Sequence, residues 1–165
     1  MIVPFCYKAA PEFVTHNYFV LLLGLIIGAE SANAQSPHTP QPGSAERQAI
    51  CDAARAHLFA KYVTRSVPGP VLFKIDHISV QNGYSNFEAI PVFKDGSHVA
   101  PNYMADIVLN FCLGKTNGAW RVIVDLSRTD VPSPTELASI KRRLPVDFPL
   151  SLFTPTWRNM LNKAQ

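Results

Sequence analysis

Four segments of the chain alternate between apolar and polar side chains, and turn residues separate them. The segments cover residues 71–80, 84–93, 105–113 and 120–126. Asn82-Gly83, between the first two, is a strong β-hairpin signal because both residue types accept the positive φ angles of a tight turn. Asp95-Gly96 and residues 114–118 mark the later turns. Alternation with a period of two puts apolar side chains on one strand face, so the pattern predicts a four-stranded antiparallel meander.

The same alternation predicts which apolar side chains share a face within each strand. The strongest set is in the third segment, and the fourth repeats the pattern. The expected sets are Val71, Phe73 and Ile75; Phe87, Ala89 and Phe93; Ala105, Ile107, Leu109, Phe111 and Leu113; and Trp120, Val122, Val124 and Leu126. A sheet with one such face needs another element to cover it.

A helix before the strands can provide that cover. Ser44 is a favourable N-cap, and residues 45–62 carry an apolar stripe at a spacing of four residues. The stripe consists of Ile50, Ala54, Leu58 and Tyr62. The proline-rich sequence at residues 68–70 ends any continuation of the helix.

The C-terminal part differs from the rest of the chain. Ser133-Pro134-Thr135-Glu136 is a capping box with proline at the first helical position, so a helix is expected up to about Leu144. Residues 145–165 are apolar and interrupted by prolines, and Thr154-Pro155 is expected to start a last short helix. Side chains this apolar should pack against the body. The predicted fold is α+β: an N-terminal helix on a four-stranded antiparallel meander, with a C-terminal helix and a Pro-rich apolar arm.

The N-terminal part has the features of a secretory leader. Residues 18–28 form an uncharged apolar run, and Ala32-Asn33-Ala34 fits the small-residue cleavage rule. Glu30 near the cleavage site and a single basic residue, Lys8, before the run are less typical, so an uncleaved anchor is the alternative. The sequence predicts a signal peptide over residues 1–34, a disordered linker over 35–43 and one domain over 44–165. The mature protein would be periplasmic or extracellular, with no transmembrane span after cleavage.

Two cysteines remain after the predicted cleavage, Cys51 and Cys112. A pair of cysteines in an oxidising compartment favours a disulfide, with free buried thiols as the alternative. Cys112 has the opposite parity to Leu109 and Phe111 in its strand. A bridge therefore requires the first helix to lie on the face of Cys112, or a bulge between Leu109 and Cys112.

Several short motifs together resemble a known group of proteins. They are a helix at residues 47–55 (Arg-x-Ala-Ile-x-Asp-Ala-Ala-Arg), a strand at 71–80 (Val-x-Phe-x-Ile-x-His-Ile-x-Val), Asn-Gly-Tyr-x-x-Phe at 82–87 and Gly-Ala-Trp-Arg-Val at 118–122. These motifs resemble a group of small exported bacterial proteins whose helix-then-curved-sheet plan is similar to cystatin-like or NTF2-like folds. The resemblance covers about residues 45–126. It implies a fold, and it implies no activity.

Candidate acid/base residues are few. Asp76, His77 and His98, with Asp95, could suggest an acid/base pair or metal ligands, but adjacent strand residues such as Asp76 and His77 are expected to point to opposite faces. These side chains are read as surface and loop residues, and no metal or cofactor is predicted. After the fourth strand come three charged residues, Asp125, Arg128 and Asp130, that could bind a charged ligand or simply fix a turn by local ion pairs.

The charge of the predicted mature chain is mildly basic. Removing Lys8, Glu12 and Glu30 leaves 14 basic against 10 acidic residues, a net charge of +4. An anionic envelope component or an envelope protein is the expected kind of partner. Nucleic acid is not, because no binding module or aromatic–basic pattern is present. The expected function is a non-enzymatic exported binding or interaction module. The alternative is a small hydrolase or isomerase with an NTF2-like pocket. Its candidate acid/base residues are Asp76, His77, His98 and Asp125.

Overall fold

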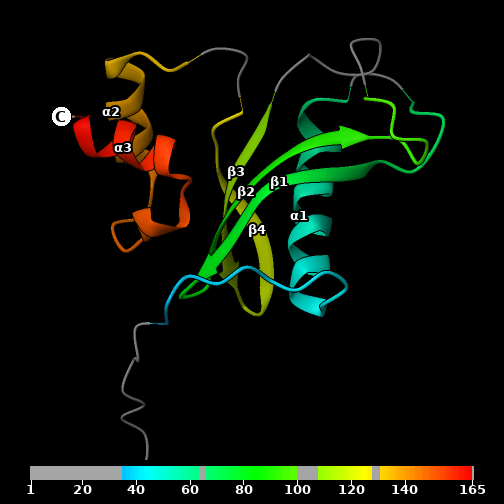
Figure 1. Ribbon diagram of the computed structural model, residues 1–165, viewed down its shortest axis with the longest axis horizontal. Helices are drawn as coiled ribbons and strands as arrows, with labels where there is room; N and C mark the ends of the chain where they lie inside the picture. Colours follow the sequence, from blue (N-terminus) through cyan, green and yellow to red (C-terminus); the bar gives the residue numbers. More distant parts are fainter. Residues whose placement is uncertain (1–34, 64–65, 100–107, 128–130, 165) are drawn as a thin grey trace, which may run out of the picture. The chain divides into compact units, whose positions relative to one another are not determined.

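A four-stranded antiparallel sheet forms the centre of the domain in the computed structural model, which describes residues 35–63, 66–99, 108–127 and 131–164 (Figure 1). The strand order follows the sequence, β1-β2-β3-β4. The elements are α1 (Ala45–Lys61), β1 (Leu72–Gln81), β2 (Tyr84–Val92), β3 (Leu109–Thr116), β4 (Ala119–Asp125), α2 (Pro134–Arg143), the 3-10 turn η1 (Leu150–Leu152) and α3 (Pro155–Lys163). The predicted α+β class, N-terminal helix and meander are confirmed, and two helices follow the sheet.

The predicted start and turn signals act as expected. Ser44 caps α1 by accepting a hydrogen bond from the backbone N–H of Arg47 at 3.2 Å. Ser133 and Glu136 form both halves of the capping box of α2. Asn82 and Gly83 have φ angles of 52° and 76°, which are the positive values that the β1–β2 hairpin turn requires. No helix in the described ranges is both long enough and apolar enough to cross a membrane.

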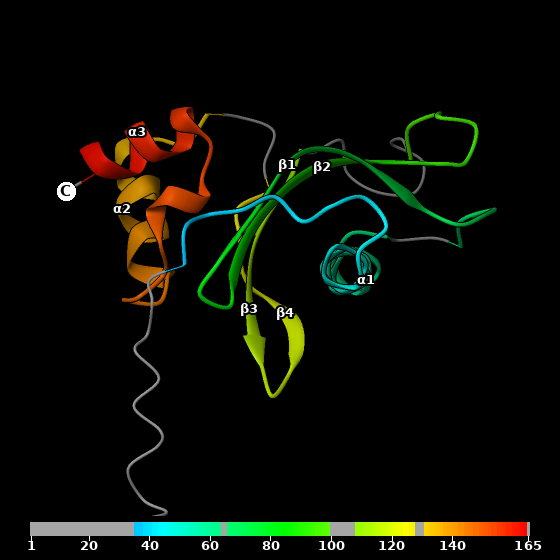
Figure 2. The same ribbon diagram turned by 60° about the horizontal axis from the view of Figure 1, so that its bottom comes forward.

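Helix α1 covers one face of the sheet (Figure 2). Its stripe residues Ile50, Ala54 and Leu58 are fully buried. The core on this face also contains Val71, Ile78, Val80, Phe87, Ala89, Val99, Leu109, Phe111, Leu113 and Trp120. The strongly apolar faces of β2 and β3 therefore pack against α1, and the area removed from water there provides most of the driving force for docking the helix.

The C-terminal segment covers the opposite face (Figures 1 and 2). We call residues 145–164 the arm. The core on this side consists of Cys112, Val124, Leu126, Leu137, Ile140, Leu144, Phe148, Leu152, Phe153, Leu161 and Ala164. Phe148 and Phe153 are in contact, with ring centroids 5.6 Å apart. The prediction that the arm is docked on the body is confirmed.

Two β-bulges change the expected distribution of side chains between these faces. In β4, Val122 pairs with Leu113 and Val124 pairs with Cys112, so Ile123 is an extra residue. Trp120 and Val122 consequently pack with the α1 core, whereas Val124 and Leu126 belong to the arm core. The prediction that all four share one face is wrong because alternation assumes an unbroken ladder. In β1, the extra residue is Asp76.

The predicted disulfide is also wrong. Cys51 and Cys112 are free thiols. Cys51 lies on α1 and packs at the edge of the α1 core, whereas Cys112 is fully buried in the arm core on the other face of the sheet. Because α1 covers the face opposite to Cys112, the sheet itself separates the two sulfur atoms.

The predicted linker is partly ordered. His38 exchanges two backbone hydrogen bonds with Val80, at 3.0 and 2.8 Å, along the free edge of β1. Pro40 is buried, and its carbonyl oxygen accepts a hydrogen bond from the Arg47 side chain at 3.0 Å. Composition alone suggested disorder, but an open sheet edge offers unpaired backbone groups that can order a neighbouring segment.

Candidate functional site

The arm side of the sheet carries a row of polar side chains beside its apolar core. Glu88 faces this side because its neighbour Ala89 belongs to the α1 core, and it stands opposite Asn110 on β3. Asn86 and Cys112 form the next pair on this face. Asn86 and Asn110 are almost completely buried. Buried polar groups on a sheet face need partners, so their hydrogen bonds define what the row can do.

The amide side chains of the row are bonded to one another and to the carboxylate. Asn86 Nδ2 donates to Asn110 Oδ1 at 2.8 Å, and Asn110 Nδ2 donates to Glu88 Oε1 at 3.1 Å. The backbone N–H of Asn110 donates to Ser127 Oγ at 3.0 Å. Asn86 Oδ1, although buried, has no hydrogen-bond partner within the described part of the chain. The row therefore ends in acceptor atoms, at Asn86 on one side and at Glu88 on the other.

Among the polar side chains of this row, Glu88 has a raised pKa. Burial of its carboxyl group raises its pKa above the ordinary value, His77 lowers it by a smaller amount, and Asp76 raises it. The carboxylate receives one neutral amide donor, which compensates only part of the lost hydration. A partly buried carboxyl group with a raised pKa next to a histidine is a common feature of functional sites, and also occurs in structural networks.

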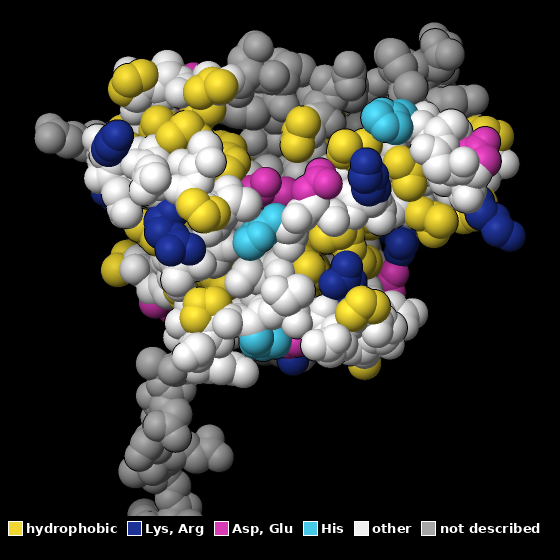
Figure 3. Space-filling view, in the orientation of Figure 1, with side chains coloured by type: hydrophobic (Ala, Val, Ile, Leu, Met, Phe, Trp, Pro, Cys, Tyr) yellow, Lys and Arg dark blue, Asp and Glu magenta, His cyan; other side chains and the backbone are white. Residues whose placement is uncertain are grey.

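His77 stands directly opposite Glu88 in the register of β1 and β2. Its Nε2 lies 2.7 Å from the carbonyl oxygen of Leu152 in η1. A carbonyl oxygen can only accept, so Nε2 carries the proton and, in the neutral ring, Nδ1 is the acceptor. The bulge inserts Asp76 beside this pair, so Asp76 and His77 both act on the same carboxylate. Acidic side chains lie next to a histidine near the middle of the face in Figure 3.

The other predicted acid, Asp125, belongs to a different cluster at the end of β4. Its Oδ2 accepts hydrogen bonds from His57 Nε2 at 2.8 Å, Lys61 Nζ at 2.7 Å and the Tyr62 hydroxyl at 2.8 Å. Its Oδ1 accepts from the backbone N–H of Ser127 at 2.9 Å. Burial alone would raise the pKa of Asp125, but these donors together hold it far below its ordinary value. We call this group the Asp125 cluster; it ties the C-terminal end of α1 to β4.

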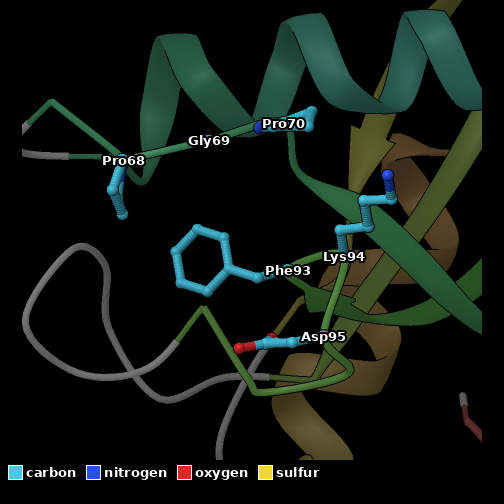
Figure 4. A pocket seen from close by; sticks show the side chains of 6 residues that line it. All are labelled: Pro68, Gly69, Pro70, Phe93, Lys94 and Asp95. Atoms are coloured by element: carbon cyan, nitrogen blue, oxygen red, sulfur yellow. The ribbon is translucent and has the colours of Figure 1, made fainter.

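An open pocket lies at the far end of the β1–β2 pair (Figure 4). Its volume is about 310 Å³, and its lining residues are Pro68, Gly69, Pro70, Phe93, Lys94 and Asp95. The Phe93 ring points into the space toward Pro68, whereas the Lys94 side chain points away from it. Asp95 is engaged in a turn, where its Oδ1 accepts from the N–H and hydroxyl of Ser97, which lowers its pKa. The pocket is therefore mainly apolar.

The remaining predicted site residues do not converge. His98 is exposed and pairs with Val92 at the end of β2. Val92 is four residues from Glu88, or about 13 Å along an extended strand, so His98 and His77 are well separated. Arg128 and Asp130 lie outside the described residues. Among those residues, no three His, Cys, Asp or Glu side chains are grouped so that they could hold a metal ion.

Sequence reasoning missed Glu88 and His57. Glu88 follows Phe87 in a strand whose other face is apolar, and a glutamate at such a position normally faces solvent. Its significance depends on the arm, which covers that face from about 60 residues further along the chain. The spacing of His57 from Lys61 by one helical turn gave a weak signal, since both then share a helix face.

Comparisons with protein-family models, curated proteins and solved structures give no match. The part of the resemblance that the structure supports is the helix packed on a four-stranded antiparallel sheet. Function must therefore be argued from the geometry of this chain.

Proposed function

We propose that the mature chain is an exported, non-enzymatic binding module. The observation that carries this proposal is that both faces of the sheet are filled, one by α1 and the other by α2 and the arm. An NTF2-like enzyme would place converging polar groups in a concavity of the sheet, whereas here the described pocket is open and mainly apolar. The carboxylate of Asp125 is already bonded to four donors, which leaves it poorly suited to proton transfer with a substrate.

The surface best suited to a partner is the basic end of the C-terminal helices. Residues 131–164 contain five basic residues and two acidic ones. Lys141 and Arg158 are used internally, because they donate to carbonyl oxygens of Ala164, Ser151 and Phe153. Arg142 and Arg143 are exposed at the end of α2. Figure 3 shows basic side chains over these helices and also over the part of the domain that contains the sheet and α1. An anionic component of the cell envelope is the partner that this charge favours.

A pull-down from the native envelope tests this proposal. Tagged protein beginning at Gln35 should retain an anionic component, and retention should fall as salt is raised because exposed charges are screened. Arg142→Glu combined with Arg143→Glu should abolish retention. A matched control, Lys74→Glu with Arg121→Glu, makes the same charge change at exposed strand positions and should leave retention unchanged. Equal loss in both variants would point to net charge alone and overturn the assigned surface.

The export part of the proposal has its own measurement. Ala32-Asn33-Ala34 after the apolar run leads us to expect Gln35 as the mature N-terminus. Mass spectrometry of the soluble protein from its native host determines this directly. Soluble protein that still carries residues 1–34 would contradict export with cleavage.

A second candidate function, a small hydrolase or isomerase, is favoured by one observation. Glu88 has a raised pKa and stands opposite His77, which is the combination that general acid/base chemistry uses. The residues involved would be Glu88 and His77, with Asp76 beside them; Asp125 and His98 lie elsewhere. Loss of a measured hydrolytic activity in Glu88→Gln would favour this alternative over the binding module.

A further inference from the structure

We propose that His57 is a nucleophilic histidine whose Nδ1 atom accepts acyl groups from activated carbonyl compounds, the class that includes anhydrides, thioesters and activated esters. The residue is part of the Asp125 cluster at the C-terminal end of α1. Covalent modification of one side chain needs no enclosed pocket, so this reactivity is compatible with a binding module. It depends neither on export nor on the anionic partner proposed above.

The first argument is the position of the ring proton. His57 Nε2 lies 2.8 Å from Asp125 Oδ2. The lowered pKa of Asp125 keeps this carboxyl group ionised at neutral pH, and a carboxylate oxygen can only accept a hydrogen bond. Nε2 therefore carries the proton. In the neutral ring, the lone pair available for attack on a carbonyl carbon is then on Nδ1.

The second argument is that the ring is held in place and is still accessible. The Phe111 ring contacts it edge-on, with centroids 5.1 Å apart, and Lys61, Tyr62 and Ser127 fix the carboxylate that holds it. The His57 side chain is nevertheless 28% exposed. Its Nδ1 has no hydrogen-bond partner within the described ranges and is not one of their buried unpartnered atoms, so the exposed part of the ring includes Nδ1.

The third argument is that the fold stabilises the charge that the reaction forms. The Nδ1 lone pair forms a bond to the carbonyl carbon, and the leaving group departs with the electron pair of the bond that breaks. The ring then carries a positive charge while Nε2 keeps its proton, and the Asp125 carboxylate lies beside that charge. A buried carboxylate in this position orients the imidazole ring and stabilises its cationic form. Loss of the Nε2 proton to solvent completes the N-acyl-histidine.

The other histidines of the described residues each lack one of these features. His38 Nε2 lies 2.9 Å from a carboxylate oxygen of Glu46, but its Nδ1 is buried. His77 Nε2 donates to a backbone carbonyl oxygen, which carries no charge. His98 is exposed, and the histidine–carboxylate pairs in the described part of the chain involve His38 and His57 alone. Among these residues, His57 therefore combines a carboxylate on one nitrogen with access to the other.

The experiment is a time course of acylation of the folded full chain with diethyl pyrocarbonate at neutral pH. Peptide mass spectrometry gives a separate rate constant for each histidine. His57 should react about tenfold faster than His98, because a charge-assisted hydrogen bond stabilises the cationic ring only at His57. This order is the reverse of the one that exposure alone would give. A rate constant for His98 equal to or above that of His57 would overturn the proposal.

Variants then test the role of the carboxylate. Asp125→Asn removes the charge beside the ring, so the rate constant of His57 should fall about tenfold while that of His98 keeps its wild-type value. Glu46→Gln makes the same chemical change at the other histidine–carboxylate pair and should leave the rate constant of His57 unchanged. If Asp125→Asn unfolds the chain, its histidines become equally reactive, and the comparison of His57 with His98 in the wild type decides the proposal. An unchanged rate constant of His57 in folded Asp125→Asn would contradict it.

Discussion

The pKa values of two carboxyl groups of this sheet, Asp125 and Glu88, are shifted in opposite directions, although each group is partly buried near a histidine. Asp125 receives hydrogen bonds from His57, Lys61, Tyr62 and Ser127, and its pKa lies far below the ordinary value. Glu88 receives one amide hydrogen bond, and burial raises its pKa. Burial acts in the same direction on both groups. The number and charge of the hydrogen-bond donors therefore decide the direction of each pKa shift.

The difference separates a carboxylate whose hydrogen-bonding capacity is used within the fold from one whose capacity is used only in part. The Asp125 cluster joins α1 to β4 with its acceptor capacity used, so it stabilises the docked helix. Among the described residues Glu88 accepts one side-chain hydrogen bond, and burial of its carboxyl group makes the ionised form costly even though His77 acts in the opposite direction. Groups that are kept in such a state are candidates for ligand binding, because the ligand supplies what the fold does not.

The largest expected effect on stability comes from removing the arm, which covers the face of the sheet that carries Glu88. A chain that ends after Val146 loses Phe148, Leu152 and Phe153 from the arm core. Burial of these three side chains contributes on the order of 5 kcal/mol, which is comparable to the whole stability of a small domain. Thermal unfolding should show a large fall in melting temperature or the loss of a cooperative transition.

A single substitution in the arm core tests the docking of the arm with a smaller perturbation. Phe153→Ala should lower the free energy of unfolding by roughly 3 kcal/mol or more and bring the pKa of Glu88 back toward its ordinary value, since water would reach it. Val146→Ala is the matched control, because Val146 is fully exposed. An unchanged melting temperature in the truncated chain would mean that the arm is not docked.

The next largest loss of stability is expected from replacing Asp125. Asp125→Asn keeps the shape of the side chain but leaves His57, Lys61 and Tyr62 without a common anionic acceptor. We expect a loss of about 3 kcal/mol at neutral pH by chemical denaturation. Because the folded pKa is lowered, this stabilisation is present above the unfolded pKa of about 3.8 and is lost as pH falls through the folded pKa. Asp52→Asn, which breaks an exposed pair with Arg55, should cost under about 1 kcal/mol.

The sequence predicted local features well and the pairing of distant groups poorly. Capping by Ser44 and Ser133 and the Asn82-Gly83 turn depend on a few neighbouring residues, so pattern and propensity determine them. The bulges at Asp76 and Ile123 depend on how the whole strands pair. One extra residue moves every later side chain of the strand to the other face of the sheet, and the alternating pattern does not indicate where that residue is inserted. The separation of the two thiols and the burial of Glu88 depend on which element covers which face of the sheet, and the sequence did not predict this.

A smaller effect is expected from Glu88→Gln. A carboxyl group with a raised folded pKa stabilises the fold in its protonated form, so its contribution is fully present below the unfolded pKa and declines as pH rises through the folded pKa. The stability of the variant relative to the wild type should therefore increase as pH rises from acidic to neutral values. Denaturation curves at several pH values measure this difference. A gain that does not change with pH would contradict the raised pKa.

The reactivity of the two thiols provides a direct comparison of the two faces of the sheet. Burial raises the pKa of both, and that of Cys112 to a much greater extent. The thiolate is the reactive form, so a thiol reagent should modify the half-buried Cys51 first and Cys112 only when the arm opens. Phe153→Ala should accelerate the reaction of Cys112 and leave that of Cys51 unchanged, because Phe153 packs only on the arm side. Denatured, unreduced protein should titrate as two free thiols. A single disulfide-bonded species in protein isolated from its host would instead require the sheet to present Cys112 on the α1 side, and would invalidate the assignment of the two faces.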